Sequence, residues 1–560
     1  MPVAFVLHAH LPWVRRNGTY PAGEQWLFEA WSESYLPLLL ACERLAAGGA
    51  RDVLTLGITP VLAEQMDDPY LLAEFHGWLG RRLLDLEYTV SRYGAADRRR
   101  LADVWSHHWR RQAALLEVVE SRFLGDGLTA AFRALADAGV IELLAGPATH
   151  PCLALVDDAA LLRGQLASGL AVAQRHLGDR PDRPRGVWTP ECAYRPAGTV
   201  ADPTVAPVSL EGGAPRLART AHELPGLEAF WSDAGVDHLV LDGPTLARAA
   251  GARERDWGSS GGDVVAPGDP LDVLDAPVLI GDSDVSAFGR NLAVSYAVWS
   301  PFGGYPADPA YRDFGAVDLE GGFKSWRVTA RERMDKQPYE PVAARERAVA
   351  HAEHFVALAA RHLAPRPDTA LVVAAYDAEL FGHWWYEGPI WLETVLRRLA
   401  ETPKLCPTTL ASALERRPPD RRLALPESSW GIGKGFGAWV TERTRGLWTA
   451  LRQAERAFVA LPPDAPGRNL AWRELTLAQA SDWPFLLVRD QSAHYAQQRV
   501  AAHLARFAAA CRGDDFASIA ELDDPWTTPA PAVTSATQQP QRVTRHLTAS
   551  PPSAERTRDA

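Results

Sequence analysis

Several short apolar segments along this chain are each followed directly by polar and aromatic side chains. The clearest example covers residues 370–389, where the apolar run Leu371–Tyr376 gives way to Asp377, Glu379 and His383. A continuous apolar run predicts a strand that is buried on both faces. In an α/β barrel, the functional side chains follow the carboxyl ends of such strands. We therefore expect residues 370–389 to contain a barrel strand that carries part of an active site.

The same pattern occurs at four other places in the sequence. The five polar clusters begin at His8, His150, Glu191, Asp282 and Asp377. Segments with helical spacing, such as Ser32–Leu45 and Ala159–Leu177, separate some of the predicted strands. Because the carboxyl ends of parallel strands meet at one end of a barrel, all five clusters are expected at a single mouth.

The remaining patterns predict the domain organisation. We expect a catalytic α/β domain over residues 1–415, interrupted by a helical insertion at 65–139, in which two long segments have helical spacing. No strand pattern is recognised after Arg416, so residues 416–525 are expected to form a helical C-terminal domain. The Gly-, Asp- and Pro-rich stretch 243–270 predicts a long mobile loop, and the Pro/Ser/Thr-rich tail 526–560 predicts disorder.

Composition excludes several classes of protein. The chain has 560 residues, of which 47% are hydrophobic and 23% charged, and its net charge of -11 argues against a nucleic-acid-binding protein. No segment has the run of about 18 apolar residues that predicts a membrane span. The five cysteines are scattered and form no CxxC pair, which favours a reducing compartment and a cytoplasmic protein without a structural zinc site. Nothing in the sequence predicts the oligomeric state.

Two acidic residues at predicted strand ends are the candidate catalytic pair. Glycosidic bond cleavage typically uses two carboxylates, and aromatic faces stack on sugar rings, so Asp377 and Glu191 in aromatic stretches suggest sugar chemistry. Glu379 and Glu387 are rivals to Asp377 that spacing alone does not exclude. The structural alternative is that each acid only forms a salt bridge or caps a helix.

Histidines provide a second group of candidates. His8 and His10 end the first predicted strand, and alternate residues of a strand point to the same side. With His150 and His383 they could bind sugar hydroxyls. Alternatively, the two N-terminal histidines, His150 and Asp377 could hold the metal of a metal-dependent hydrolase. A non-catalytic glucan-binding protein is the third possibility. Each histidine taken alone is more simply a structural one.

Other polar and aromatic candidates come from loops and from the C-terminal region. Trp430 and Trp439 flank a glycine-rich segment that lacks the nucleotide-binding patterns and suits a sugar clamp, or else anchors the helical domain. Arg290 and Arg195 could keep the catalytic acids ionised, or brace loops. Asp482 could reach the same cleft from the helical domain, although core packing of its segment is at least as simple an explanation.

Four of these segments resemble the signature regions of family-57 glycoside hydrolases, in particular of the 1,4-α-glucan branching enzymes in that family. The resemblance runs from the first strand to about residue 515. It rests on HAHLPWVR from residue 8, WTPECAYRP from 188, SDVSAFGR from 283 and YDAELFGHWWYEG from 376. It implies an incomplete (β/α)7 barrel with a helical insertion and an all-helical C-terminal domain. It also implies a retaining mechanism on an α-glucan such as amylose or a glycogen-like polymer, without a metal or other cofactor.

The resemblance also implies residue roles. Glu191 matches the nucleophile and Asp377 the general acid/base. The binding positions that we expect from the resemblance and from the residue patterns together are His8, His10, His150, Arg290, Trp299, His383, Trp384, Trp430, Trp439 and Asp482. The related branching enzymes are similar in having a tyrosine on a mobile loop over the cleft, whereas stretch 243–270 has only Trp257 as an aromatic residue. A 4-α-glucanotransferase or an α-amylase of the same fold therefore stays as the alternative.

Overall fold

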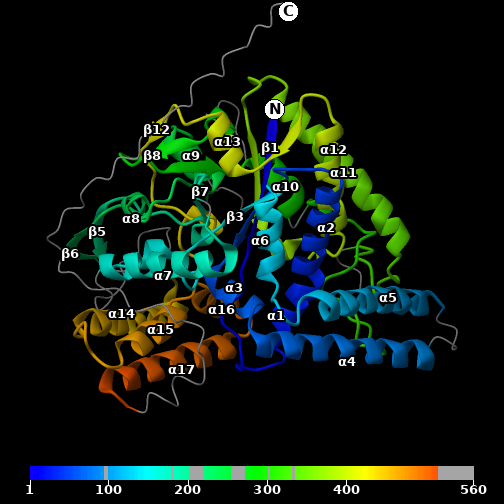
Figure 1. The fold of residues 1–560 in the computed structure, drawn as a ribbon, viewed down its shortest axis with the longest axis horizontal. Coiled ribbons are helices and arrows are strands. Elements are labelled where there is room, and N and C mark those ends of the chain that lie inside the picture. Colours follow the sequence, from blue (N-terminus) through cyan, green and yellow to red (C-terminus); the bar gives the residue numbers. More distant parts are fainter. Residues whose placement is uncertain are drawn as a thin grey trace, which may run out of the picture.

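A parallel sheet lies at the centre of the α/β fold (Figure 1). The computed structural model describes residues 1–93, 99–179, 181–201, 219–253, 271–300, 303–330 and 335–514. The first sheet has the order β10-β1-β2-β3, with β11 also pairing with β1, and all of these pairs are parallel. Its strands are β1 (Pro2–Ala9), β2 (Leu54–Ile58), β3 (Ile141–Leu144), β10 (Val372–Asp377) and β11 (Cys406–Thr408).

A second sheet has the order β12-β8-β9-β7-β4. Its strands are β4 (Gly186–Val187), β7 (His238–Leu241), β8 (Val278–Ile280), β9 (Ser286–Gly289) and β12 (Arg422–Leu423). A parallel bridge between Ala145 and Val187 joins β3 of the first sheet to β4 of the second. Beyond β9, the backbone N–H of Asn291 donates to the carbonyl oxygen of Val373 in β10 at 2.8 Å. The two sheets are therefore joined at both of these edges.

The strands bury side chains on both of their faces, as their apolar sequences require. In β1, Val3, Phe5 and Leu7 belong to one hydrophobic cluster, whereas Ala4 and Val6 belong to another. The second cluster takes side chains from around both sheets: Ala4, Val6, Leu144, Trp188, Val240, Phe288, Val373 and Ala375. Alternate residues of β1 thus face an interior shared with the other strands, and the remaining residues face the helices.

Helices cover the outer side of the sheets and extend from them. Those between and beside the strands are α1 (Glu24–Ala30), α2 (Leu36–Ala47), α3 (Pro60–Met66), α7 (Ala159–Leu177), α8 (Leu227–Asp233), α9 (Gly243–Ala249), α10 (Leu292–Trp299), α11 (Pro341–Leu363), α12 (Gly388–Glu401) and α13 (Leu410–Arg416). A short antiparallel hairpin, β5 (Gly198–Ala201) with β6 (Arg219–Leu224), follows β4. No helix among the described residues is long and apolar enough to span a membrane.

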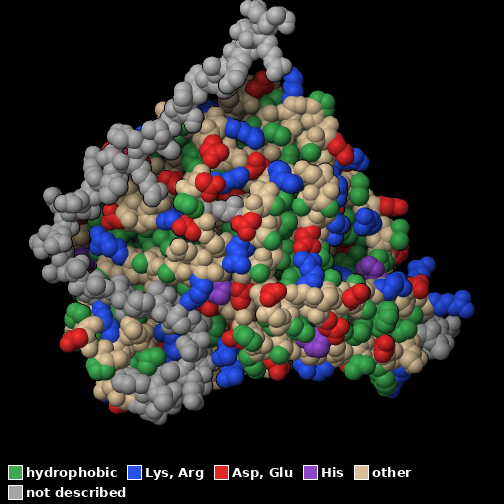
Figure 2. All heavy atoms as spheres, in the orientation of Figure 1, with side chains coloured by type: hydrophobic (Ala, Val, Ile, Leu, Met, Phe, Trp, Pro, Cys, Tyr) green, Lys and Arg blue, Asp and Glu red, His purple; other side chains and the backbone are tan. Residues whose placement is uncertain are grey.

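Two helical regions project from the sheets in Figure 1. The long helices α4 (Pro69–Tyr93) and α5 (Arg99–Arg122) lie side by side at the lower right and lead into α6 (Thr129–Asp137). The C-terminal helices lie at the lower left and below the centre: α14 (Arg445–Ala460), α15 (Arg468–Ala478), α16 (Asp482–Arg489) and α17 (Ala493–Arg512). Figure 2 shows acidic and basic side chains interspersed over the same face, which fits a chain with 58 basic and 69 acidic residues.

Two sequence predictions are wrong: that residues 243–249 belong to a loop, and that the strands stop at about residue 416. Residues 243–249 form α9 rather than a loop, because Asp242 caps the helix by accepting from the N–H of Gly243, and Pro244 is tolerated in the first turn. The strands also continue beyond residue 416, because β12, at Arg422–Leu423, pairs with β8. The rest of the predicted loop, residues 254–270, and the predicted disordered tail, 526–560, lie outside the described residues.

Candidate active site

Glu191 lies in a tight turn directly after β4. It has a φ of 62°, and the next residue, Cys192, has a φ of 47°. Two successive non-glycine residues in the left-handed region are unusual, and such backbone strain is concentrated at functional sites. The Glu191 carboxylate accepts one hydrogen bond on each oxygen, from Ser481 Oγ to Oε1 at 2.7 Å and from Trp430 Nε1 to Oε2 at 2.8 Å. The turn therefore presents a carboxylate whose two oxygens are both fixed.

Asp377 ends β10 and lies beside His8 in the pairing of β1 with β10. Burial, then the negative charges of Glu379 and Glu191, hold the pKa of Asp377 well above its ordinary value, and the positive charge of Arg290 opposes this shift only partly. No hydrogen bond from a described residue stabilises the ionised form of the carboxyl group. The environment of Asp377 therefore favours a protonated acid.

The pKa of Glu191 is also raised by burial, but hydrogen bonds from Ser481 and Trp430 oppose that rise. The two carboxyl groups thus differ in environment. Glu191 accepts from two donors that favour its ionised form, whereas Asp377 has no donor among the described residues, and the charge of Arg290 offsets the rise of its pKa only in part. Neighbouring carboxyl groups with different environments are the usual arrangement for a nucleophile and a general acid.

Three histidines stack together beside this pair. The rings of His8 and His10 are nearly parallel with centroids 5.9 Å apart, and those of His10 and His150 are 3.9 Å apart. His8 also stacks on Trp188 at 4.4 Å. His8 lies in β1 and His10 directly follows that strand, so their arrangement agrees with alternate residues of a strand pointing to one side.

Helix α16 brings further polar groups from the C-terminal region. Asp482 Oδ2 lies 2.9 Å from His10 Nε2, and Ser481 contacts both His150 and Glu191. Asp482 was a sequence candidate. Ser481 was not, because nothing in the sequence pattern distinguishes it from other serines, although its position next to Asp482 is a signal that could have been used.

Three of these residues could in principle hold a metal ion, since ligand atoms of His10, His150 and Asp482 lie within 4.8 Å of one another. All four ring nitrogens of the two histidines already have hydrogen-bond partners: Thr59 and Asp482 for His10, and His8 and Ser481 for His150. The acid in this group is Asp482, whereas the metal hypothesis from the sequence used Asp377. We therefore interpret the group as a hydrogen-bond network.

The glycine-rich segment contributes one tryptophan directly to the site. Trp430 donates to Glu191, while the ring of Trp439 is only 1% exposed and packs in the C-terminal core. That burial favours the packing alternative for Trp439. Arg290 does not pair with either candidate acid: it binds Asp242 at 2.7 Å, and Lys434 of the glycine-rich segment binds the same carboxylate at 2.8 Å.

The remaining candidates are placed around the strand that ends in Asp377. His383 pairs with Glu33 at 2.8 Å, so its ring is engaged in an ion network. Trp299 and Trp384 are both exposed, and their ring centroids lie 6.4 Å apart. Glu379 accepts from the backbone N–H of His10 and from Tyr35, which favours a supporting role for this rival acid.

The other candidates from loops have structural surroundings. Glu387 is fully buried and accepts from the backbone of Arg312. Arg195 donates to the carbonyl oxygens of Pro196 and Pro225, which is the loop-bracing alternative. Neither residue contacts Glu191 or Asp377 through a hydrogen bond that the structure describes.

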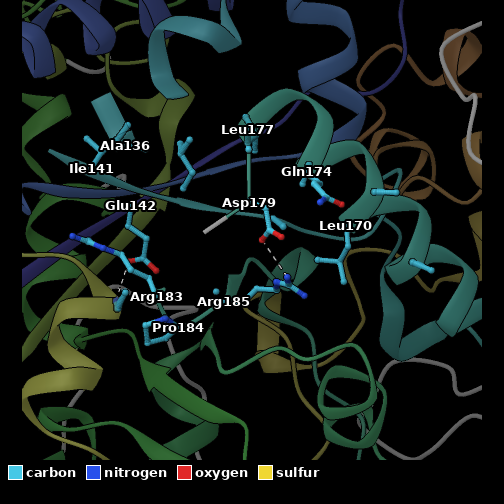
Figure 3. A pocket seen from close by; sticks show the side chains of 18 residues that line it. Ala136, Ile141, Glu142, Leu170, Gln174, Leu177, Asp179, Arg183, Pro184 and Arg185 are labelled. Carbon is cyan, nitrogen blue, oxygen red and sulfur yellow. Dashed lines mark hydrogen bonds and ion pairs between the residues drawn. The ribbon is translucent and has the colours of Figure 1, made fainter. Parts of the chain in front are cut away.

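A separate cavity of about 330 Å³ lies at the other ends of the strands. It is lined by the beginnings of β3 and β4 and by the C-terminal half of α7 (Figure 3). Its polar groups include Glu142, which hydrogen-bonds His238, and Arg185, which pairs with Asp179. Because Glu191 and Asp377 follow the carboxyl ends of their strands, this cavity is not part of the candidate active site.

Comparison with known proteins shows matches along most of the chain. The model of glycosyl hydrolase family 57 matches residues 4–426, and a model of the C-terminal region of 1,4-alpha-glucan branching enzymes matches residues 464–514. A 1,4-alpha-glucan branching enzyme of Thermococcus kodakarensis is 34% identical over 516 residues, covering 90% of this chain and 72% of the relative. A probable 1,4-alpha-glucan branching enzyme of Mycobacterium tuberculosis is 35% identical over 543 residues, covering 89% of each.

Solved structures agree with these matches. The crystal structure of a family-57 branching enzyme from Thermococcus kodakaraensis, in complex with glucose, has a TM-score of 0.83 at 31% identity, covering 95% of this chain and 96% of that one. A branching enzyme of the same type from Pyrococcus horikoshii has a TM-score of 0.79 at 30% identity, covering 95% and 97%. The fold is thus similar to those two structures over nearly the whole of each chain.

Proposed function

The chain belongs to glycosyl hydrolase family 57, and from this premise we propose that it is a retaining 1,4-α-glucan branching enzyme. Such an enzyme cleaves an α-1,4 bond and transfers the released segment to a 6-hydroxyl of a glucan. The observation that carries the proposal is the pairing of Glu191, with two hydrogen-bond donors, and Asp377, with a raised pKa. The match of residues 464–514 to the C-terminal region of branching enzymes favours branching over other reactions of the family.

The two carboxyl groups perform the reaction in two steps. Ionised Glu191 attacks the anomeric carbon, and protonated Asp377 gives its proton to the leaving oxygen, which produces a covalent β-glucosyl ester on Glu191. Asp377, now ionised, then removes the proton from the incoming 6-hydroxyl as that oxygen displaces Glu191. The raised pKa of Asp377 suits the first step because it keeps the carboxyl group protonated at pH values at which an ordinary aspartate is ionised.

Side chains around the pair would bind the sugar and exclude water. His10 and Asp482 form one wall, and the partly exposed pair of Trp299 and Trp384 offers aromatic faces to the glucan. Helix α16 brings Asp482 from the C-terminal region, so that region contributes to the site itself. A site closed by this region favours transfer to a bound acceptor over hydrolysis.

We infer further that the seven strands β1, β2, β3, β4, β7, β9 and β10 form an incomplete (β/α)7 barrel. Three observations support this arrangement: the bridge between β3 and β4, the hydrogen bond of Asn291 to β10, and the interior cluster shared by the strands. The catalytic domain would then run from residue 1 through β12 (Arg422–Leu423), with an insertion at 65–139, and the helical domain that completes the cleft would follow β12.

Incubation with amylose tests the proposal directly. After the reaction, a debranching enzyme is added and the chain lengths are analysed before and after this step. We expect new α-1,6 linkages, so that debranching releases shorter linear chains from a product that initially shows few new reducing ends. Redistributed linear chains without branches would instead indicate a 4-α-glucanotransferase, and linear fragments with many reducing ends an amylase. The absence of a tyrosine from stretch 243–270 keeps these alternatives open.

Chelation tests the metal alternative that the group of His10, His150 and Asp482 raises. Because both ring nitrogens of each histidine have hydrogen-bond partners, we expect branching activity to stay within about twofold after dialysis against a chelator. Loss of activity that is restored by adding zinc would contradict this expectation.

The proposed site of action is the cytoplasm, which the five free cysteines support.

A further inference from the structure

A line of hydrogen bonds connects His8 to the candidate nucleophile. The Nε2 atoms of His8 and His150 lie 2.9 Å apart, His150 Nδ1 lies 3.0 Å from Ser481 Oγ, and Ser481 Oγ lies 2.7 Å from Glu191 Oε1. The first three residues are buried, and Glu191 is half-buried. The line therefore runs through a region from which bulk water is largely excluded.

The direction of every proton in this line follows from the chemistry of its members. An ionised carboxylate only accepts, so Ser481 donates its single hydroxyl proton to Glu191 and must accept from His150 Nδ1–H. Burial holds the pKa values of His8 and His150 well below the ordinary value, so each ring is neutral and has one N–H. His150 Nε2 is then an acceptor, and His8 donates to it through Nε2–H.

An independent observation agrees with this assignment. It leaves His8 Nδ1 without a proton, and that nitrogen is a buried atom that has no hydrogen-bond partner among the described residues. A bare acceptor nitrogen without a partner costs less than a buried N–H donor without one, because unpaired donors are the rarer case in folded proteins. All three hydrogen bonds thus point toward the carboxylate.

We propose that Ser481 is a positioning residue for the nucleophile, and that His150 and His8 act through it by directing its hydroxyl proton to Glu191. This inference rests on the proposed retaining mechanism, in which Glu191 attacks in its ionised form. It gives His150 a role in addition to sugar binding. It also explains how a residue of the C-terminal region takes part in the chemistry of a carboxylate that follows a strand.

The local structure separates this role from a merely structural one. Ser481 immediately precedes α16, yet its side chain makes no capping hydrogen bond to that helix. The segment is attached to the loop after β3 by the backbone, since the N–H of Ser481 donates to the carbonyl oxygen of His150 at 3.1 Å. Removing only the hydroxyl group therefore leaves the backbone contacts of α16 intact.

Several ionisable groups face Glu191, and the hydrogen bond from the Ser481 hydroxyl opposes those that raise its pKa. Burial and the charge of Asp482 raise the pKa of Glu191, while the Ser481 and Trp430 donors and His10 lower it. Among the described residues, Asp377 and the thiols of Cys152 and Cys192 also interact with its charge. Because a donor to the ionised form is lost in Ser481→Ala, the pKa of Glu191 must rise in that variant.

The test compares Ser481→Ala with the wild-type enzyme in amylose cleavage. We expect kcat to fall about tenfold to hundredfold, the size expected for one hydrogen bond to a charged group, with KM changed less than about twofold. The acidic limb of the pH profile of kcat/KM should move to higher pH, and Ser481→Thr should move it back. Ser168→Ala is the matched control: it removes a buried serine that accepts from Trp472 of α15, so it should leave the limb in place.

His8→Phe tests the far end of the line and does not depend on the folding of the Ser481 variants. It keeps an aromatic ring stacked on Trp188 but removes the donor to His150, so a smaller shift of the acidic limb in the same direction is expected. The ionisation of Glu191 can also be followed without substrate, as the carboxylate infrared band that disappears in Glu191→Gln.

These readouts distinguish the inference from the proposed function. If the wild-type enzyme cleaves amylose without branching it, the proposed function fails, but the comparison of cleavage rates still tests Ser481. If the wild-type enzyme does not cleave amylose, the infrared band of the Glu191 carboxylate still reports whether its pKa rises in Ser481→Ala. An unchanged pKa of Glu191 in Ser481→Ala, together with a kcat within about twofold of wild type, would overturn the inference.

Discussion

Glu191→Ala is expected to lower kcat for amylose cleavage and branching by about 10⁴-fold or more while leaving the protein folded. The expected loss is large because the side chain forms the covalent bond of the first step, and no other described carboxylate accepts from both Ser481 and Trp430. The measurement is the initial rate of cleavage of amylose, with thermal unfolding followed in parallel to show that the variant is folded.

Glu191→Gln is the matched control for this experiment. It keeps the volume of the side chain and an oxygen that can accept a hydrogen bond, yet an amide is a very poor nucleophile, so its activity should be as low as that of the alanine variant. Relief of strain in the left-handed turn is not expected in either variant, because both retain a side chain at a φ of 62°. Substantial turnover by either variant would show that Glu191 is not the nucleophile.

Asp377→Ala is expected to lower kcat for amylose by about 10³-fold or more, because it removes the proton donor of the first step and the base of the second. The loss should depend on the leaving group. An α-maltosyl fluoride needs no proton to leave, so with this donor the first step should proceed and the second should become limiting. Added azide should then speed turnover and give an α-glycosyl azide, since azide needs no base and attacks the face opposite to Glu191.

The pH dependence gives a further readout for Asp377. Its carboxyl group must be protonated in the first step, so activity of the wild-type enzyme falls as pH rises through the raised pKa. That basic limb should be absent from the reaction of Asp377→Ala with the fluoride. Glu379→Gln is the comparison: if it, and not Asp377→Ala, showed azide rescue and loss of the basic limb, the rival acid would be the catalyst.

Much of the central sheet could be predicted from the sequence because its strands are short apolar runs. The predicted helix Ala159–Leu177 has the same bounds as α7 in the structure. The strand before Asp377 is also where the sequence places it. Such segments are determined by local periodicity, which a sequence displays directly.

Features that depend on tertiary contacts were not predictable in the same way. Strand β12 has only two residues and exists because it pairs with β8. The hydrogen bond of Ser481 to Glu191 joins residues that are 290 positions apart, and no periodicity connects a helix start with a turn after a strand. From the sequence, His383 is a candidate for binding a sugar or a metal. In the structure it pairs with Glu33, which also forms an ion pair with Arg312.

The sequence proposes the main residues of the candidate site but says nothing of their electrostatics. The sequence predicts Glu191 and Asp377 as a pair, yet the two donors that distinguish the environment of Glu191, Ser481 and Trp430, come from distant parts of the chain. Burial, which is the largest influence on the pKa of both acids, is a property of the folded chain alone.

Trapping of the covalent intermediate tests the central claim, that Glu191 is the nucleophile of a retaining transfer, most directly. Asp377→Ala is mixed with an α-maltosyl fluoride, digested with a protease, and its peptides are analysed by mass spectrometry. Because the second step lacks its base, the adduct should accumulate, and we predict a maltosyl group on the peptide that contains Glu191, lost on addition of azide. Absence of any adduct while the fluoride is consumed, or an adduct on another carboxylate, would contradict the account.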